Sequence, residues 1–300
     1  MDTQNLKAFQ MVAEKGSFSE AAEVLFLTQP AVSKRIAALE QQLNCRLFDR
    51  IGRQVTLTEA GRALLPRARQ ILLEVTDTQR LISDLSGEVK GTLSLATSHH
   101  IGLHRLPPVL REFARTYPEV RLDLDFLDSE KAYDEVVHGR YDLAVITLAP
   151  DTEALRDIKI DSRIRSHIIW PDSLRFVTSP EHPLVKQRNL ELSDLSPYPA
   201  ILPDINTYTT KLIKHLFDQR GVNLEITMAT NHLDTIKMMV SIGLGWAVLP
   251  DTIIDQQLQP LKIGQVNIAR KLGCIYHSER SLSNAANAFL KILQHHAKTA

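Results

Sequence analysis

The chain has 300 residues with 35 Lys and Arg against 35 Asp and Glu, and its apolar fraction of 44% suits a globular protein with room for several domains. Cys45 and Cys274 are too few for a disulfide framework and are not spaced as zinc ligands, which indicates structural thiols in a reducing compartment. The N-terminal residues lack the pattern of a signal peptide, and no apolar run is long enough to cross a bilayer, so we expect a cytoplasmic protein without membrane contact.

Three short helices are predicted within the first 45 residues. An apolar stripe of helical spacing begins at Leu6 and stops before Gly16, a residue type that commonly ends helices. Ser17 is a predicted cap for a second, short helix. Thr28 caps a third helix, which carries Pro30 in its first turn, where a missing N–H costs little.

A hairpin and a long helix are predicted next. Two short strands around Gly52 indicate a wing, and a helix begins near Thr58. Its apolar positions follow heptad spacing, interrupted only at Thr78, and are Leu64, Ala68, Ile71, Val75, Ile82 and Leu85. This pattern predicts a coiled-coil seam that joins two chains through residues 58–86, with burial against a globular domain as the alternative.

The pattern changes to alternating strands and helices after Gly91. The first strands are predicted at 92–97, 120–127 and 141–146, and a second series at 174–178, 200–202, 225–228 and 246–249. Strands separated by helices predict doubly wound α/β units. The strand at 120–127 alternates apolar and charged residues, so we expect it at a sheet edge or a subunit contact.

The third helix has the properties of a DNA-reading helix. Gln29, Ser33 and Lys34 fall on its early outward face, with Arg35 beside them. Between positions 28 and 70, eight Lys and Arg stand against three Asp and Glu, an excess of five positive charges. Base edges need donors and acceptors, and phosphates need cations, so this segment is suited to DNA; a solvated charged face is the alternative.

Several segments together resemble the signature of LysR-type transcriptional regulators. They include Gly16-Ser17-Phe18-Ser19, Leu27-Thr28-Gln29-Pro30-Ala31-Val32-Ser33, Leu47-Phe48-Asp49-Arg50 and Leu57-Thr58-Glu59-Ala60-Gly61. The resemblance implies an α/β protein with an N-terminal winged helix-turn-helix at 1–58, a linker and dimerisation helix at 59–88 and an effector-binding domain at 89–300. It further implies that Gln29, Pro30, Ser33, Lys34 and Arg35 approach bases or phosphates, and that Arg50 and Arg53 lie at the flanking groove.

The C-terminal region resembles the family's effector domain through its length and through Glu181-His182-Pro183-Leu184, Gly243-Leu244-Gly245 and Leu249-Pro250. This resemblance implies two lobes like those of periplasmic binding proteins. Lobe I would take about 91–163 and 268–300, and lobe II about 164–267, with crossing strands near 161–167 and 264–270. The partners implied are double-stranded promoter DNA, a small-molecule effector and further copies of the chain up to a tetramer, with RNA polymerase as a further candidate. No cofactor is expected.

The effector would bind between the lobes, at the carboxyl ends of the strands. The residues expected there are Thr97, Ser98, His99, Asp128, Ser129, Thr147, Pro203, Asp204, Thr207 and Asn231, with Trp246 as a wall. Hydroxyls ahead of helices suit an anion such as a carboxylate, but helix capping by Ser98 or Thr207 is an equal alternative. For Trp246, a core position is commoner than a place in the wall of a cleft.

Enzymatic and metal functions are weaker interpretations. The chain has no G-x-S-x-G elbow, no P-loop and no H-E-x-x-H motif, so we expect no catalysis. His99, His100 and His104 are close in sequence, but they lack an evident carboxylate partner and are expected as surface residues without a metal. A solute-binding protein would share the two lobes, but it would not need a DNA-reading helix.

Overall fold

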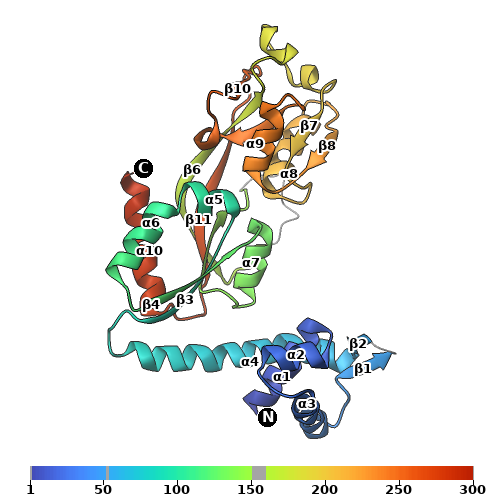
Figure 1. The fold of residues 1–300 in the computed structure, drawn as a ribbon, viewed down its shortest axis with the longest axis vertical. Helices are drawn as coiled ribbons and strands as arrows, with labels where there is room; N and C mark the ends of the chain where they lie inside the picture. The colour runs from blue at the N-terminus through green and yellow to red at the C-terminus, as the bar shows by residue number, and fades with distance from the viewer. Residues whose placement is uncertain (1, 52–53, 151–159, 300) are drawn as a thin grey trace. The chain divides into compact units, whose positions relative to one another are not determined.

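The computed structural model describes residues 2–51, 54–150 and 160–299. The chain forms two compact units, Met1–Leu85 and Ser86–Ala300, so the long helix belongs to the first unit (Figure 1). Within the described ranges, no helix combines the length and the apolar character that a membrane span needs.

The first unit is a three-helix bundle with a hairpin and a long helix. Its elements are α1 (Thr3–Lys15), α2 (Phe18–Val24), α3 (Gln29–Leu43), β1 (Phe48–Ile51), β2 (Gln54–Leu57) and α4 (Glu59–Asp84). The predicted caps Ser17 and Thr28 are confirmed, because each accepts a hydrogen bond from a backbone N–H of the following helix, and Thr58 caps α4 in the same way. Gly16 ends α1 with a φ of 64°, a left-handed conformation in which glycine is not strained.

The core of this unit joins all four helices. The Phe48 ring meets Phe9 in a tilted contact and Phe18 edge to face, and α4 adds Ala68 and Leu72 to the same cluster. Ala68 is fully buried, so this position of the predicted seam packs within its own unit. The apolar positions of α4 therefore fall into two groups: some pack in the core of the first unit, and others face away from the bundle.

The second unit is built on a seven-stranded sheet of order β10-β6-β11-β5-β3-β4, with β9 pairing to β6. The strands are β3 (Gly91–Thr97), β4 (Val120–Phe126), β5 (Leu143–Thr147), β6 (Ile164–Thr178), β9 (Ala247–Pro250), β10 (Gln259–Pro260) and β11 (Ile268–His277), and β7 (Ala200–Leu202) pairs with β8 (Ile226–Ala229) apart from it. The helices are α5 (His99–His104), α6 (Pro107–Thr116), α7 (Ser129–Val137), α8 (Tyr208–Asp218), α9 (Leu233–Ser241) and α10 (Asn284–Thr299). As predicted, β4 lies at the sheet edge.

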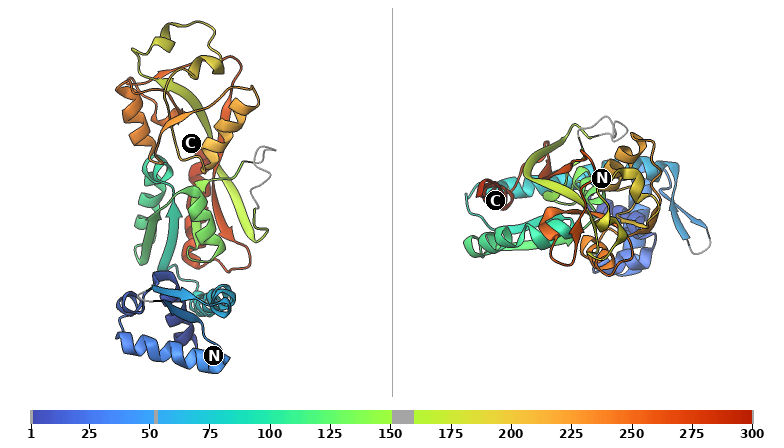
Figure 2. Two further views of the ribbon diagram at one scale, coloured as in Figure 1. Left: turned by 90° about the vertical axis from the view of Figure 1, so that its right-hand side faces the viewer. Right: turned by 90° about the horizontal axis from the view of Figure 1, so that it is seen from above.

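Two lobes follow from this arrangement. Lobe I carries α5, α6, α7 and α10 around β3, β4 and β5, whereas lobe II carries α8 and α9 with β7, β8 and β9 (Figure 2). The long antiparallel strands β6 and β11 run through both lobes and are paired along almost their whole length. They are the strands that connect the two lobes.

The sequence-based prediction of β6 was wrong in one respect. It placed a crossing strand at 161–167 and a separate lobe II strand at 174–178, whereas β6 is continuous over Ile164–Thr178. Pro171 and Asp172 look like a strand break in the sequence. They remain in the ladder because Asp172 lies opposite Arg270 of β11, and the two side chains form an ion pair.

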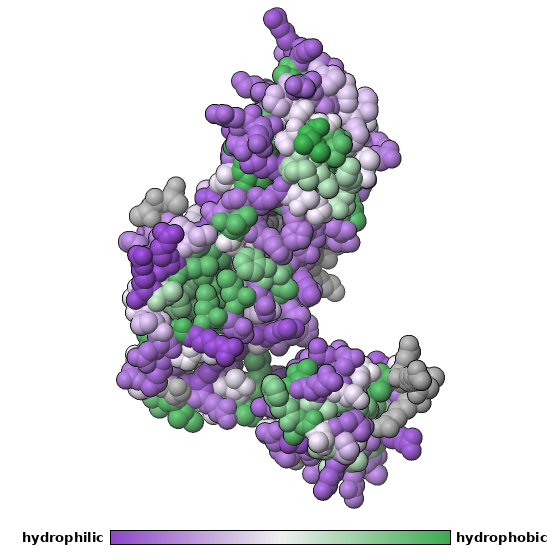
Figure 3. All heavy atoms as spheres, viewed as in Figure 1, coloured by the Kyte–Doolittle hydropathy of each residue, from purple (hydrophilic) through white to green (hydrophobic). Residues whose placement is uncertain are grey.

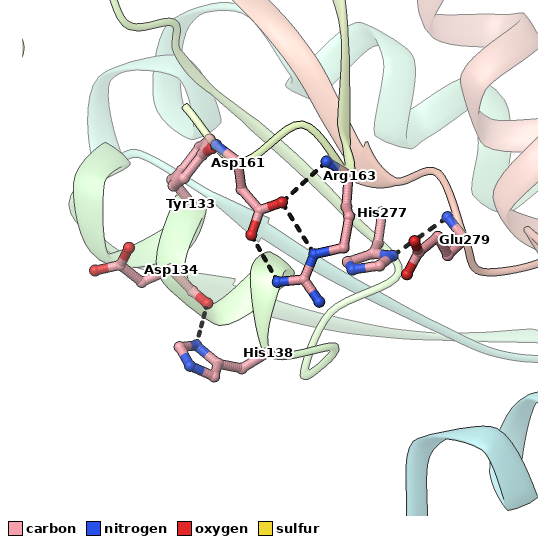
Figure 4. Close-up of polar contacts among 7 residues, drawn as sticks. All are labelled: Tyr133, Asp134, His138, Asp161, Arg163, His277 and Glu279. Atoms are coloured by element: carbon pink, nitrogen blue, oxygen red, sulfur yellow. Dashed lines mark hydrogen bonds and ion pairs between the residues drawn. The ribbon is translucent and has the colours of Figure 1, made fainter. Parts of the chain in front are cut away.

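A polar cluster lies where the chain enters β6 (Figure 4). The Arg163 guanidinium donates to both Asp161 carboxylate oxygens, from Nε at 2.9 Å and from Nη2 at 2.6 Å, and the Tyr133 hydroxyl accepts from the Asp161 backbone N–H. These hydrogen bonds from Arg163 hold the pKa of Asp161 well below its usual value. Because the bonds join the start of β6 to α7, we interpret the cluster as structural.

Candidate functional site

The exposed early face of α3 carries the polar residues that the sequence predicted. Gln29, Pro30 and Lys34 are exposed, whereas Ser33 and Arg35 are half-buried. Gln29 Nε2 donates to Ser33 Oγ at 3.0 Å, and Arg35 Nη1 donates to Gln4 Oε1 at 3.3 Å. Both bonds lie on the surface, so the amide, the hydroxyl and the guanidinium remain available to another molecule.

The wing is tied to α3 and α4 by side-chain hydrogen bonds. Glu40 Oε1 accepts from Leu47 N at 2.7 Å, and Thr58 Oγ1 donates to Arg46 O. Arg50 lies in β1 opposite Val55, and its side chain lies outside the described part. Arg53 also lies outside the described residues, so its predicted role stays a prediction.

The outward side of α4 is apolar toward its C-terminal end. Ile71 is 36% exposed, Ile82 62% and Leu85 79%, and Leu81 beside them is 50% exposed. Four large apolar side chains in water on one helix are costly unless another surface covers them.

A cavity of about 50 Å³ lies between the two lobes of the second unit. The residues that line it are Ser98, His99, His100, Asp128, Ser129, Glu130, Thr147, Pro203, Thr207, Thr209, Asn231, Leu233 and Arg270. Eight of these were expected from the sequence: Ser98, His99, Asp128, Ser129, Thr147, Pro203, Thr207 and Asn231. The lobe I residues come together because the neighbouring parallel strands β3, β4 and β5 end at the same edge of the main sheet, whereas the lobe II residues follow the paired strands β7 and β8.

The two capping hydroxyls differ. Thr207 Oγ1 accepts from Thr210 N at 3.3 Å, so this hydroxyl caps α8 as the alternative interpretation held. Ser98 precedes α5 but makes no capping hydrogen bond. Ser129 Oγ accepts from Thr147 N at 3.1 Å, which leaves its proton free to be donated.

Three of the expected residues do not line the cavity. Thr97 is fully buried, and its hydroxyl donates to Val145 O, because its place in the strand turns the side chain into lobe I. Asp204 Oδ1 instead accepts from the backbone and side chain of Asn206. Trp246 is 1% exposed, stacks on Phe217 and donates to backbone carbonyls, so the core position applies and the wall role does not.

Arg270 is a buried cation of the cavity that was not predicted from the sequence. Arg270 Nε donates to Asp172 Oδ2 at 2.7 Å, and Arg270 Nη1 donates to Thr209 Oγ1 at 2.7 Å. Arg105 Nη2 lies 3.7 Å from the other Asp172 oxygen, and its guanidinium lies over the Trp170 ring. The pair formed by Arg270 and Asp172 joins the two crossing strands at the cavity.

His100 lies beside this cation and is also buried, contrary to the surface position expected for it. It is 5% exposed, and burial together with the positive charges of Arg270, His104 and Arg105 lowers the pKa of His100 to about 3. The imidazole is therefore neutral in the folded protein near pH 7.

The acidic residues Asp128 and Glu130 occupy another part of the cavity wall. Glu130 Oε1 of lobe I accepts from Tyr208 N of lobe II at 2.6 Å, and burial raises the pKa of Glu130. Asp128 Oδ2 accepts from Asn231 Nδ2 at 2.9 Å, which is a second link between the lobes. The N-terminus of α8 is thus already occupied by a carboxylate.

Histidine contacts also join the lobes. His104 Nε2 lies 3.1 Å from Asp234 Oδ1, so this histidine has the carboxylate partner that the sequence did not reveal. The rings of His99 and His232 meet edge to face with centroids 4.3 Å apart. Over the described ranges, no group of three or more His, Cys, Asp or Glu is arranged to hold a metal ion.

Comparison with known proteins identifies both units. Residues 3–62 match the model of the bacterial regulatory helix-turn-helix proteins of the lysR family, and residues 86–298 match the model of the LysR substrate binding domain. A probable RuBisCO transcriptional regulator from Cyanidioschyzon merolae is 32% identical over 292 residues, which are 95% of this chain and 94% of that protein.

Two solved structures share the fold. A full-length OxyR variant from Pseudomonas aeruginosa superposes with a TM-score of 0.70 at 18% identity, over 99% of this chain and 95% of that one. Full-length CbnR in complex with its target DNA superposes with a TM-score of 0.63 at 21% identity, over 100% of this chain and 99% of that one. At such identities, the likeness concerns the fold alone.

Proposed function

The chain belongs to the LysR family of bacterial transcriptional regulators, and on that premise we propose what it reads on DNA, how it assembles and what it senses. It is a DNA-binding regulator with an effector-binding domain, not an enzyme. We propose that the protein acts in the cytoplasm, where promoter DNA lies.

Residues on the exposed face of α3 read the operator in the major groove. The single observation that carries this role is that Gln29, Ser33 and Lys34 combine base-reading chemistry with neighbouring positions on one helix, where Gln29 and Lys34 are exposed and Ser33 is half-buried. CbnR was solved bound to target DNA with the same fold, which supports the role without locating any contact. Pro30 and Arg35 approach bases or nearby phosphates, and Arg50 and Arg53 lie at the flanking groove.

Assembly proceeds through α4. Its exposed apolar side chains, Ile82 and Leu85 above all, would be covered by α4 of a second chain, which places two reading helices on one palindromic site. An apolar area also shows on lobe I in Figure 3. Separately, Leu103 and Phe126 are large apolar residues of lobe I with exposed side chains. A contact between such lobes would extend the dimer to a tetramer that bends DNA.

The effector is a small molecule with a negative group, bound in the cavity between the lobes. The links from Asp128 to Asn231 and from Glu130 to Tyr208 run from one lobe to the other at this cavity. A ligand held between them has different contacts in differently closed lobes, so it shifts the populations of those states and, through the assembly, the contact with DNA and RNA polymerase.

A response through the thiol of Cys274 is not favoured. Cys274 lies fully buried in β11, and burial raises the pKa of Cys274 to about 12. A buried thiol that stays protonated is a poor nucleophile for oxidants.

The reading role of α3 is tested by footprinting on the promoter that the protein binds. Ser33→Ala should weaken specific binding, by about 1 kcal/mol or more for a lost base contact, with little change on unrelated DNA. Lys34→Ala should weaken both kinds of binding and reduce the salt dependence of binding by about one phosphate per subunit.

A double variant on the second unit is the control. Lys186 and Ser193 are exposed in lobe II, so changing both to alanine should leave the footprint as in the wild type. An unchanged footprint for both α3 variants would remove α3 from the reading role.

A further inference from the structure

Unpaired buried nitrogen atoms gather at one place in the second unit. Among the described residues, the buried side-chain nitrogen and oxygen atoms without a hydrogen-bond partner are both ring nitrogens of His100, Arg105 Nε and Arg270 Nη2. Buried polar groups in folded proteins almost always have partners, so such a cluster needs an explanation. Both arginine atoms are donors, and a neutral imidazole supplies one more, so the missing partner must bring acceptors.

The charges at this place also call for an acceptor. Asp172 is the carboxylate that both Arg105 and Arg270 approach, at 3.7 and 2.7 Å, and it is 1% exposed. Two guanidinium groups around one carboxylate leave an excess of one positive charge. A ligand carboxylate at Arg270 would balance that charge and accept from Nη2.

The cavity has a negative part close to this positive part. The Glu130 carboxylate binds Tyr208 N, and the Arg270 guanidinium binds Thr209 Oγ1, so opposite charges meet consecutive residues of α8. Asp128 lines the same cavity and adds a second carboxylate. The cavity therefore presents both signs of charge within the span of one small molecule.

The size of the cavity limits that molecule further. A water molecule needs roughly 10–15 Å³ of such space, and the cavity offers about 50 Å³, so a ligand of only a few heavy atoms fits in this conformation. A bare oxyanion would satisfy Arg270 but would face Asp128 and Glu130 without a countercharge. A bare amine would leave the nitrogens of Arg270 and His100 unpaired.

We propose that the effector is a small α-amino acid, whose carboxylate binds Arg270 and His100 and whose ammonium group binds Glu130 and Asp128. This inference rests on the proposed function, in which the cavity between the lobes is the effector site, and it makes that effector a zwitterion instead of a simple anion. Ser98 and Ser129 lie beside these groups and supply neutral hydroxyls.

Matched probes test the inference on the full-length protein. Glycine and L-alanine carry both charges, acetate and propionate lack the amino group, and L-alaninamide lacks the carboxylate. Binding is measured by titration calorimetry and by the thermal shift of tryptophan fluorescence, because Trp170 and Trp246 are the only tryptophans and both lie in the second unit. At least one of the two amino acids should bind about tenfold or more tightly than the carboxylate that lacks its amino group, which is acetate for glycine and propionate for L-alanine. It should also bind about tenfold or more tightly than L-alaninamide.

Variants assign each end of the ligand. Glu130→Gln keeps an acceptor for Tyr208 N but removes the charge, so amino-acid binding should weaken about tenfold while acetate and propionate bind no more weakly. Arg270→Lys keeps a cation beside Asp172 but removes Nη2, so both groups of probes should weaken. Glu135→Gln, on the same helix as Glu130 but outside the cavity, should behave as the wild type.

The outcomes separate this inference from the proposed function. If each amino acid and its matched carboxylate bind the wild type equally, the effector is not a zwitterion, and the proposal of an anionic effector still holds. Failure of all five probes to bind would also overturn the inference, whereas the footprint of the α3 variants decides independently whether the protein reads DNA.

Discussion

His100 is a buried base, and its protonation opposes folding. Burial first, and then the charges of Arg270, His104 and Arg105, lower its pKa from 6.5 to about 3 in the folded protein. An unfolded chain takes up this proton as the pH falls below about 6.5, whereas the folded chain does not until about pH 3. The contribution of His100 to stability is therefore complete above pH 6.5 and is lost progressively below it.

We predict that His100→Asn removes part of the acid sensitivity of the second unit. Between pH 7 and pH 5, the wild type should lose about 2 kcal/mol more unfolding free energy than the variant, since the proton bound by the unfolded chain is absent from the variant. Urea unfolding followed by tryptophan fluorescence reports on this unit. His138→Asn, on the exposed end of α7, is the matched control, and equal slopes for wild type and His100→Asn would contradict the burial of a neutral imidazole.

Some residues of the cavity could be predicted from the neighbouring sequence, and others could not, because their roles depend on residues far away in the chain. Ser98, Asp128 and Thr207 stand where a strand gives way to a helix, and that junction is visible in the local sequence. Arg270 is a cation within the strand β11, and its partner Asp172 is 98 residues away, so its role depends on a pairing that no local pattern reveals. Likewise, Thr97 and Trp246 have cavity-like positions in the sequence, and only the direction of the side chain excludes them.

Elements that are fixed by local caps were predicted closely. The starts of α2, α3 and α4 follow their capping residues Ser17, Thr28 and Thr58, because each cap satisfies an N–H that the helix itself leaves free. The continuity of β6 was not predictable in the same way. A strand that contains Pro171 and Asp172 is held together by its long pairing with β11, which is a property of the fold and not of the segment.

Gly61, in the first turn of α4, is required by the close approach of that helix to the chain that enters the wing. A Cβ atom at this position would lie 2.2 Å from Leu47 O and 2.8 Å from Leu57 Cδ2. Because backbone stands on one side of the contact, no side-chain movement relieves it. We predict that Gly61→Ala destabilises the first unit by about 1–3 kcal/mol or more.

This destabilisation should be confined to the first unit. Hydrogen exchange measured by mass spectrometry should accelerate in peptides from α1, α2 and α3 and remain unchanged in peptides from residues 86–298. Ala63→Ser adds one heavy atom to an exposed position of the same helix, so it serves as the control. Similar exchange for Gly61→Ala and Ala63→Ser would mean that the hairpin adjusts to the added methyl group.

The helix α4 packs in the core of the first unit, and in our proposal it also forms the dimer. Different residues serve these two roles, so substitutions can affect assembly without affecting folding. Leu64 and Ala68 belong to the core of the first unit, so a charge at either position would unfold the helix-turn-helix and would say nothing about dimers. Ile82 and Leu85 are 62% and 79% exposed, so a charge there leaves the core intact. Any loss of assembly can then be assigned to the lost contact.

We predict that Ile82→Glu combined with Leu85→Glu weakens the dimer while the chain remains folded. Like charges would face each other across a helix pair, and the buried apolar area would be lost, which together should raise the dissociation constant by at least about a hundredfold. Sedimentation velocity measures the assembly, and footprinting should show loss of binding to the paired half-sites, since two linked reading helices bind far more tightly than one. Ile242→Glu, which places the same charge on an exposed apolar position of lobe II at 65% exposure, is the control. A dimer that withstands the change at 82 and 85 would move the interface away from α4 and onto the lobes.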